Sequence, residues 1–402
     1  MNGVLLFATV PLVTALIGWL TNWSAIKMIF QPKTFVGIGK LGWQGILYKQ
    51  GEKFATGMAD MVQDHLITAK EIAANIDPQE VVAIWVKELE SSIPELCEKI
   101  ASEVGEKNAW DGLPDHVKTM VAAQLKIQCS KIGLELLESM QGEADEFIDV
   151  KRIVYEQLSG ENISRLARLT KKIAKEEFKF IEIYGGVFGF LIGLVQVGVW
   201  SVMQTWWLMP VVGVVVGTVT NWLAIQMIFR PQEPKKYFGL FTYQGLFAKR
   251  QPDIAKDYGE TANSEILTLD VFWEMLTQGE SGKKVEDYTT QFLEEKLEKQ
   301  LALYQGILPF AWTKEHTEKS QKVIEAHVSS MESQIRKSLD PTIEKGLDVG
   351  EVIETRLAAL PKPQFEMLLR RIFEEDELTL ILVGGFLGGV VGALQGLWLL
   401  SF

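Results

Sequence analysis

The distribution of charge along the chain is the feature that most restricts its fold. Three segments, residues 1–26, 183–229 and 378–402, contain no Asp, Glu, Lys or Arg, so all 40 basic and 52 acidic side chains lie between them. A soluble protein spreads its charged residues along the chain, whereas a chain that crosses a bilayer must keep them out of the hydrocarbon. The sequence therefore predicts an integral membrane protein.

The uncharged segments have room for four membrane-spanning helices. A span needs about 20 mostly apolar residues, and residues 3–26 and 379–400 each supply one. The central segment is too long for one helix and is interrupted by polar residues and tryptophans, which favour the membrane interface. We therefore expect two spans there, at 184–201 and 206–229, and the predicted fold class is an all-α integral membrane protein with four transmembrane helices.

The residues that follow the first and third spans predict the orientation. Residues 27–53 and 230–250 each carry five basic residues and one acidic residue, whereas the tails and the central hairpin carry no charge. Because positively charged flanks stay inside, we expect both large charged blocks, residues 31–182 and 231–377, in the cytoplasm. Both termini are then expected outside.

The chain also repeats itself. The segment GWLTNWSAIKMIFQP, which begins at Gly18, matches GTVTNWLAIQMIFRP, which begins at Gly217, with ten of fifteen residues identical at an offset of 199. At the same offset, a series of glycines and a glutamine recurs near the end of each half: Gly185, Gly189, Gly193 and Gln196 correspond to Gly384, Gly388, Gly392 and Gln395. This pattern predicts a parallel internal duplication.

The duplication divides the chain into a first repeat, residues 1–201, and a second repeat, residues 202–402. Each repeat has two spans, so both copies insert the same way up, unlike the inverted repeats of many transporters. Apolar residues at helical spacing, such as those from Val121 to Met140, predict amphipathic helices in both charged blocks. We expect each block to form its own helical bundle or long helical hairpin.

The repeated motif, Gly-x-x-Thr-Asn-Trp-x-Ala-Ile-x-Met-Ile-Phe-x-Pro after a membrane helix, resembles the YheB/YjiN-like bacterial membrane proteins. The resemblance touches both halves and all four predicted helices. It implies a location in the bacterial inner (plasma) membrane. The family carries only the description of a domain of unknown function, so the resemblance implies no activity. The motif differs between the copies at Lys27, which Gln226 replaces.

The Thr-Asn-Trp segments are the most informative candidate site. An amide inside the bilayer needs a partner, because lipid offers none. In one interpretation, the two asparagines fasten the first and third spans together at the pseudo-two-fold axis. In the other, the segments line a small pathway or a lipid head-group pocket. The candidate residues are Thr21, Asn22, Trp23, Thr220, Asn221 and Trp222.

The glycine series predicts a helix-packing stripe. Glycines four residues apart let two membrane helices approach closely, because apolar side chains gain little by leaving lipid for one another. Gln196 and Gln395 follow one turn later, and we expect them to bond across the same interface. A gating or ion-binding role for these glutamines is the alternative.

Composition and motifs argue against several classes of function. The net charge of −12 is unsuited to a nucleic-acid surface. The four histidines are scattered, and Cys97 and Cys129 are too few for a disulfide framework and are expected to be small buried residues. Gly37-Ile-Gly39-Lys-Leu-Gly42 fits a dinucleotide-binding pattern but follows a membrane helix instead of a strand. We therefore expect no enzyme, cofactor or metal site.

Two functional hypotheses follow. The first is a non-enzymatic scaffold or membrane-organising protein that presents its cytoplasmic helices. The second is a transporter or lipid-handling protein that uses a polar seam around Asn22 and Asn221. The expected partners are the lipid bilayer, anionic head groups near the basic flanks, a cytoplasmic protein and a second copy of the chain.

Overall fold

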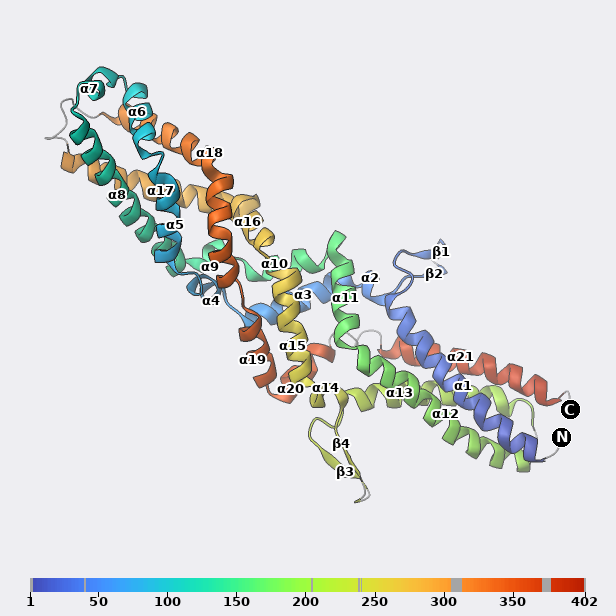
Figure 1. Ribbon diagram of the computed structural model, residues 1–402. Coiled ribbons are helices and arrows are strands. Elements are labelled where there is room, and N and C mark those ends of the chain that lie inside the picture. Colours follow the sequence, from blue (N-terminus) through green and yellow to red (C-terminus); the bar gives the residue numbers. More distant parts are fainter. Residues whose placement is uncertain are drawn as a thin grey trace. The chain divides into compact units, whose positions relative to one another are not determined.

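The computed structural model describes residues 3–39, 41–203, 205–237, 239, 241–304, 313–370 and 377–400. The chain forms two compact units, and each unit draws on both halves of the sequence (Figure 1). Unit 1 contains residues 1–66, 154–261 and 350–402, and unit 2 contains residues 67–153 and 262–349. The units therefore do not coincide with the two repeats expected from the sequence.

Unit 1 is built on four long helices, as the charge pattern predicts. They are α1 (Gly3–Phe30), α12 (Lys175–Met203), α13 (Leu208–Phe229) and α21 (Glu377–Leu400). Each is long and apolar enough to cross a membrane. The predicted all-α membrane fold with four spans is thus confirmed, although α1 and α12 extend several residues beyond the predicted spans.

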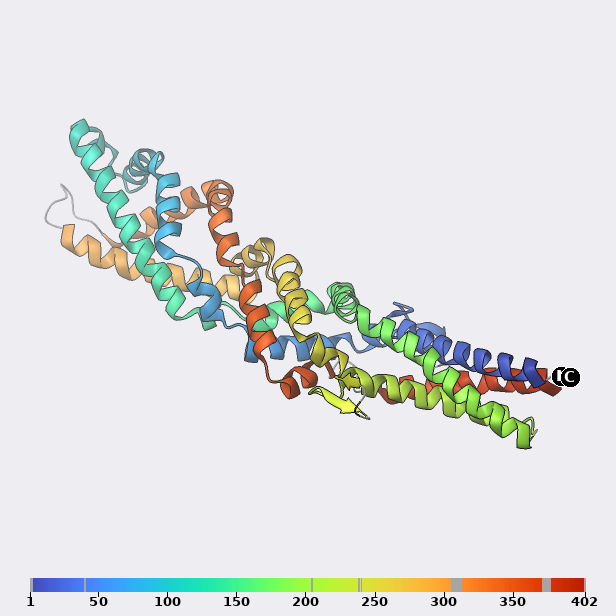
Figure 2. The same cartoon turned by 60° about the horizontal axis from the view of Figure 1, so that its bottom comes forward.

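The four spans associate as two close antiparallel pairs, α1 with α12 and α13 with α21. The start of α1, the end of α12, the start of α13 and the end of α21 lie at one end of the group (Figures 1 and 2). At the opposite end, α1 and α13 finish at Phe30 and Phe229, and a β-hairpin follows each of them. We call this end the hairpin end. Spans α1 and α13 are therefore parallel, and each has an antiparallel partner from its own half of the chain.

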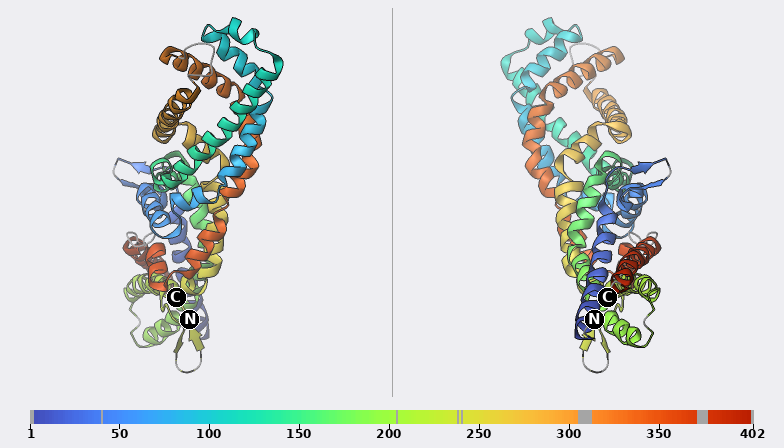
Figure 3. Two further views of the ribbon diagram at one scale, coloured as in Figure 1. Left: turned by 90° about the vertical axis from the view of Figure 1, so that its left-hand side faces the viewer. Right: turned by 90° about the vertical axis from the view of Figure 1, so that its right-hand side faces the viewer.

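A short β-hairpin follows each of these two spans. Strand β1 (Val36–Ile38) pairs with β2 (Leu41–Trp43), and β3 (Lys235–Tyr237) pairs with β4 (Phe241–Tyr243), both antiparallel. The two hairpins leave unit 1 in different directions (Figures 1 and 3). The sequence predicts no strands here, because three-residue strands are too short to show an alternating pattern.

Shorter helices complete unit 1 beside the hairpin end: α2 (Ile46–Lys49), α3 (Gly51–Met61), α11 (Ile163–Ile173), α14 (Leu246–Lys249), α15 (Gln251–Thr261), α19 (Gly350–Ala359) and α20 (Lys362–Arg370). Helix α10 (Val150–Leu158) crosses the boundary between the units. The α15–α19 contact is tight, since a Cβ atom at Gly259 would lie 2.4 Å from the carbonyl oxygen of Gly350. Buried Gln251 also donates to the carbonyl of Leu360 at 2.8 Å, which fixes the end of α19.

Unit 2 contains only helices among its described residues: α4 (Ala69–Ala74), α5 (Pro78–Glu90), α6 (Ile93–Glu103), α7 (Lys107–Asp111), α8 (Asp115–Gly142), α9 (Ala144–Phe147), α16 (Leu269–Thr277), α17 (Gly279–Tyr304) and α18 (Lys314–Gly346). Helix α18 of the second half packs against α5 and α6 of the first. The expectation of one separate bundle for each block is therefore wrong. An amphipathic stripe shows which face of a helix is buried but not which helix covers it.

The two cysteines allow a prediction about pH. Burial raises the pKa of Cys97 to about 11, and burial also raises the pKa of Cys129. At pH 8 only about one Cys97 thiol in a thousand is then ionised, and the thiolate is the reactive form. We expect iodoacetamide to label both cysteines slowly in the native protein at pH 8, and Cys97 to react faster as the pH approaches 11. Labelling at the rate of the denatured chain, measured by mass spectrometry, would contradict this.

Candidate functional site

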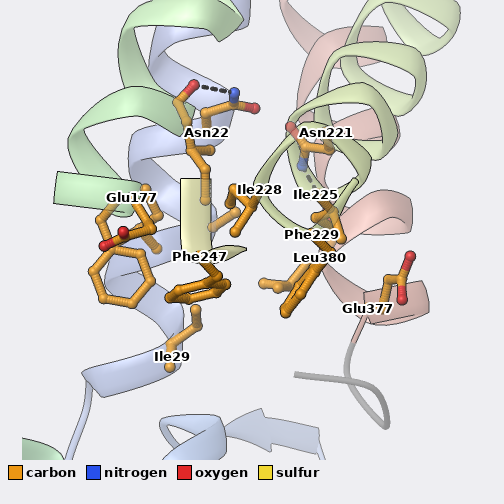
Figure 4. A pocket seen from close by; sticks show the side chains of 14 residues that line it. Asn22, Ile29, Glu177, Asn221, Ile225, Ile228, Phe229, Phe247, Glu377 and Leu380 are labelled. Atoms are coloured by element: carbon orange, nitrogen blue, oxygen red, sulfur yellow. Dashed lines mark hydrogen bonds between the residues drawn. The ribbon is translucent and has the colours of Figure 1, made fainter. Parts of the chain in front are cut away.

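The four spans enclose a small cavity near their hairpin end, between the two helix pairs. Its volume is about 40 Å³, which is room for little more than one or two water molecules. Its walls are mostly apolar and come from all four spans and from α14, with two amides and two carboxylates among them (Figure 4). The residues that define this seam cavity are Asn22, Ala25, Ile26, Ile29, Glu177, Phe178, Ile181, Asn221, Ile225, Ile228, Phe229, Phe247, Glu377 and Leu380.

Both asparagines of the repeated motif reach the seam cavity, and both are fully or almost fully buried. The Nδ2 atom of Asn22 donates to the carbonyl of Ile181 on α12 at 2.7 Å. The Nδ2 atom of Asn221 donates to the carbonyl of Leu380 on α21 at 2.8 Å. Each amide therefore binds the helix paired with its own. The expectation that the asparagines fasten the first span directly to the third is wrong.

The side-chain oxygens of these asparagines have a different environment. The two amide groups approach each other across the seam cavity (Figure 4). Neither Asn22 Oδ1 nor Asn221 Oδ1 has a hydrogen-bond partner within the described part of the chain. Two facing acceptors do not stabilise each other, so the arrangement favours a hydrogen-bond donor between them.

The other four residues of the motif do not line the cavity. The hydroxyl of Thr21 donates to the carbonyl of Gly18 at 3.1 Å, and that of Thr220 donates to the carbonyl of Val216 at 2.8 Å. These bonds stay within a single helix. The side chains of Trp23 and Trp222 are 37% and 48% exposed, so they lie on the outer surface of the spans, where lipid can contact them.

The glycine stripe lies at the contacts within each helix pair. In the first pair, a Cβ atom at Gly185 would lie 2.5 Å from the carbonyl oxygen of Gly18, and one at Gly189 would lie 2.4 Å from that of Thr14. A Cβ atom at Gly193 would lie 2.6 Å from the Cα atom of Pro11. Backbones this close exclude any larger residue, which is the use expected of small residues in membrane helices.

The second pair repeats these contacts. A Cβ atom at Gly384 would lie 2.3 Å from Nδ2 of Asn221, one at Gly388 would lie 2.1 Å from the carbonyl oxygen of Gly213, and one at Gly392 would lie 2.3 Å from that of Met209. The hydrogen bonds of Asn22 and Asn221 also correspond, because each joins residues 159 positions apart in the sequence. The two pairs thus use equivalent residues in the same way.

The two glutamines differ from each other. Gln196 is buried, its Oε1 lies 3.0 Å from the hydroxyl of Thr14, and its Nε2 contacts the sulfur of Met209 on α13. It therefore joins its own pair to the third span. Gln395 is also buried, but its Nε2 has no hydrogen-bond partner among the described residues.

Two carboxylates complete the seam cavity and were not singled out from the sequence. Glu177 is 1% exposed, and Arg250 Nη1 lies 2.8 and 2.9 Å from its two oxygens. Glu377 lies near Arg370, with a closest contact of 3.5 Å, and accepts a bond from Gln226 at 3.4 Å. No local pattern distinguishes these residues from the many other acidic residues, because Arg250 and Gln226, with which they interact, lie 73 and 151 residues away in the sequence.

The chain is similar to bacterial membrane proteins of unknown function. Residues 12–144 match the DUF445 family model, described as a protein of unknown function. A UPF0754 membrane protein of Bacillus thuringiensis is 23% identical over 100% of this chain and 99% of its own length. One from Bacillus velezensis is 42% identical over 17% of this chain and 19% of its own length.

A UPF0754 membrane protein of Listeria monocytogenes serotype 4a is 30% identical over 44% of this chain, and the match spans about half of that relative's length (52%). No solved structure matches the chain. The resemblance expected from the repeated motif is confirmed, and so is the membrane location.

Proposed function

We propose that this protein is a non-enzymatic scaffold, anchored in the bacterial inner membrane by unit 1, that offers the helices of unit 2 to a cytoplasmic protein partner. The observation that carries the proposal is the packing of the four spans. Glycine contacts and asparagine bonds fasten each pair at close range. Such an interface suits a fixed anchor better than helices that must slide or separate during a transport cycle.

Unit 2 supports the proposal because one of its longest helices is incompletely covered. Helix α8 runs for 28 residues, yet only Gly133 in it is fully buried. Met120 and Ile127 on the same helix are 68% and 59% exposed. Exposed apolar residues on a long helix suit a surface that binds another protein.

The orientation in this proposal rests on the basic residues beside the hairpin end. Lys33, Lys235 and Lys236 follow the two spans that finish there and are exposed. Positive flanks favour the cytoplasmic side. The hairpin end, and with it unit 2, is then cytoplasmic, and both termini are outside.

A second candidate function, transport or lipid handling through the seam, is favoured by one observation. The oxygens of Asn22 and Asn221 face the seam cavity without partners in the described part of the chain. Polar groups inside the bilayer often mark a substrate or ion pathway. Four spans are few for a solute transporter, although a dimer would double them.

Reconstitution distinguishes the two candidates. Vesicles that contain the purified full chain are assayed for lipid scrambling and for ion flux, beside protein-free vesicles. The scaffold predicts no activity above the protein-free level. Flux in the wild type that disappears in a correctly assembled Asn22→Leu/Asn221→Leu variant would overturn the scaffold. We expect this variant instead to lose roughly 0.6–2 kcal/mol for each lost bond and to assemble poorly.

Photo-crosslinking in cells tests the partner. A photoreactive amino acid at Ile127 is expected to give a discrete crosslinked product, because this side chain is apolar and exposed. The matched control replaces Glu286, an exposed polar residue on α17. The same pattern of products at both positions would contradict a specific surface on α8.

A further inference from the structure

The two β-hairpins begin and end at the last turn of a span. The amide of Gly45 donates to the carbonyl of Pro32 at 2.8 Å, and the amide of Gly245 donates to that of Pro231 at 2.8 Å. A Cβ atom at Gly45 would lie 2.9 Å from the carbonyl carbon of Phe30, the last residue of α1. Both ends of each hairpin are therefore held against the end of a span, so each hairpin starts at the membrane surface.

A hydrogen bond from a glutamine side chain joins the residues just after each hairpin to those just before it. Gln44 Nε2 donates to the carbonyl of Lys33 at 2.9 Å, and Gln244 Nε2 donates to that of Gln232 at 2.8 Å. Strands rise about 3.3 Å per residue, so each three-residue strand reaches only about 10 Å. The hairpins are consequently short, braced projections that cannot move far from the head-group layer.

The strands of the first hairpin contain only glycine and apolar residues, and several of their side chains are exposed. Phe35, Val36 and Ile38 are 50%, 62% and 90% exposed, and Ile38 is the most exposed large apolar side chain of those described. Most other exposed apolar side chains of unit 1 lie on the spans, where lipid covers them. An apolar group beside the membrane surface is favoured where it can enter the boundary between head groups and acyl chains.

The second hairpin carries charge at the equivalent positions. Lys235, Lys236 and Tyr237 replace Val36, Gly37 and Ile38 at the offset of 199 residues. Both lysines are exposed, and neither forms an ion pair with another described residue. The Lys235 Nζ lies 5.7 Å from the centre of the Tyr237 ring. Lysine beside tyrosine at the bilayer surface suits contact with anionic phosphate groups.

We propose that both hairpins bind the bilayer itself: the first inserts its apolar side chains into the head-group boundary, and the second binds the phosphates of anionic lipids. The two hairpins thus bind the membrane surface on two sides of the spans. This inference depends only on the membrane location and not on the scaffold function, so either can fail without the other.

The first experiment measures the surroundings of single fluorophores on the full chain in vesicles. Ile38→Cys is labelled in a Cys97→Ala/Cys129→Ala background that melts like the wild type. Leu191→Cys, exposed on α12, gives the lipid reference, and the fluorophore on free cysteine gives the aqueous reference. We expect quencher-bearing lipids to quench the label at position 38 at least half as strongly as the one at 191. Quenching equal to the aqueous reference would overturn insertion.

The second experiment tests the lysines with a label at Thr242→Cys, which faces Lys236 across the hairpin. Vesicles of neutral phosphatidylcholine are compared with vesicles that contain 30% phosphatidylglycerol, at low and high salt (the 30% being roughly the anionic content that gives a clear surface potential). Lipid quenching should increase in the anionic vesicles, and salt should reduce the increase. Lys235→Gln/Lys236→Gln should abolish it, whereas the control Lys283→Gln/Lys284→Gln in unit 2 should not. An increase that survives the first double substitution would overturn the head-group assignment.

Discussion

Alanine at Gly189 is expected to destabilise the protein by about 1–3 kcal/mol, the usual cost of forcing extra volume into a packed interface. The new Cβ atom would lie 2.4 Å from the carbonyl oxygen of Thr14, which is backbone and cannot rotate away. Helices α1 and α12 must then separate, which weakens the packing between them. Thermal unfolding of the purified chain, followed by light scattering, should show a lower midpoint. Gly388→Ala should act in the same way on the other pair.

Gly186→Ala is the matched control for Gly189→Ala. It lies on the same helix, but its Cβ atom would meet neighbouring atoms only at 3.6 Å, an ordinary contact distance. Since alanine favours a helix over glycine by about 1 kcal/mol, this variant should be neutral or slightly more stable. Equal melting of both variants would show that the close approach of the helices contributes nothing.

Arg250→Met is expected to destabilise the protein more than Gly189→Ala does. It leaves the carboxylate of Glu177 buried without its cationic partner. Breaking one side of a buried pair costs about 3–5 kcal/mol, because the remaining charge has lost its solvent and its partner. The same melting assay should therefore show a large fall in the midpoint.

Two further variants show whether the buried charge is the cause. Glu177→Met/Arg250→Met removes both charges and should recover most of the lost stability. Lys319→Met breaks an ion pair of similar length, 2.9 Å, with Glu315 on the exposed surface of α18. This control should cost less than about 1 kcal/mol. A double variant as unstable as Arg250→Met would argue that arginine packing, and not charge, matters at this position.

The membrane architecture could be predicted because it follows from local composition. Charge must stay out of the hydrocarbon, so three uncharged segments predict four spans without any knowledge of contacts. The need of Asn22 for a protein partner could also be predicted, because lipid offers an amide no hydrogen bond. Its partner could not, because the face of a helix does not specify which neighbour covers it, and the partner is the carbonyl of Ile181.

The same reason explains the other differences from expectation. The ion pair of Glu177 and Arg250 joins residues from different halves of the chain, so neither has a local signature. The apolar stripes suggested a separate bundle in each charged block, but α18 of the second half packs against α5 and α6 of the first. Strands β1 and β3 have three residues each, which is too few for a periodic pattern.

Because each unit contains residues from both halves of the chain, neither unit can finish folding until most of the chain has been synthesised. Unit 2 includes residues up to 349 and unit 1 includes the last span, so neither unit can fold from the first half of the chain alone. At roughly 5–20 residues per second, the ribosome takes roughly ten to forty seconds to extend the chain from residue 153 to residue 349. During that delay the faces of α5 and α6 that α18 later covers remain open to chaperones and proteases. A chain truncated after its first two spans would keep them open permanently, so it is expected to be degraded rather than to accumulate as half a protein.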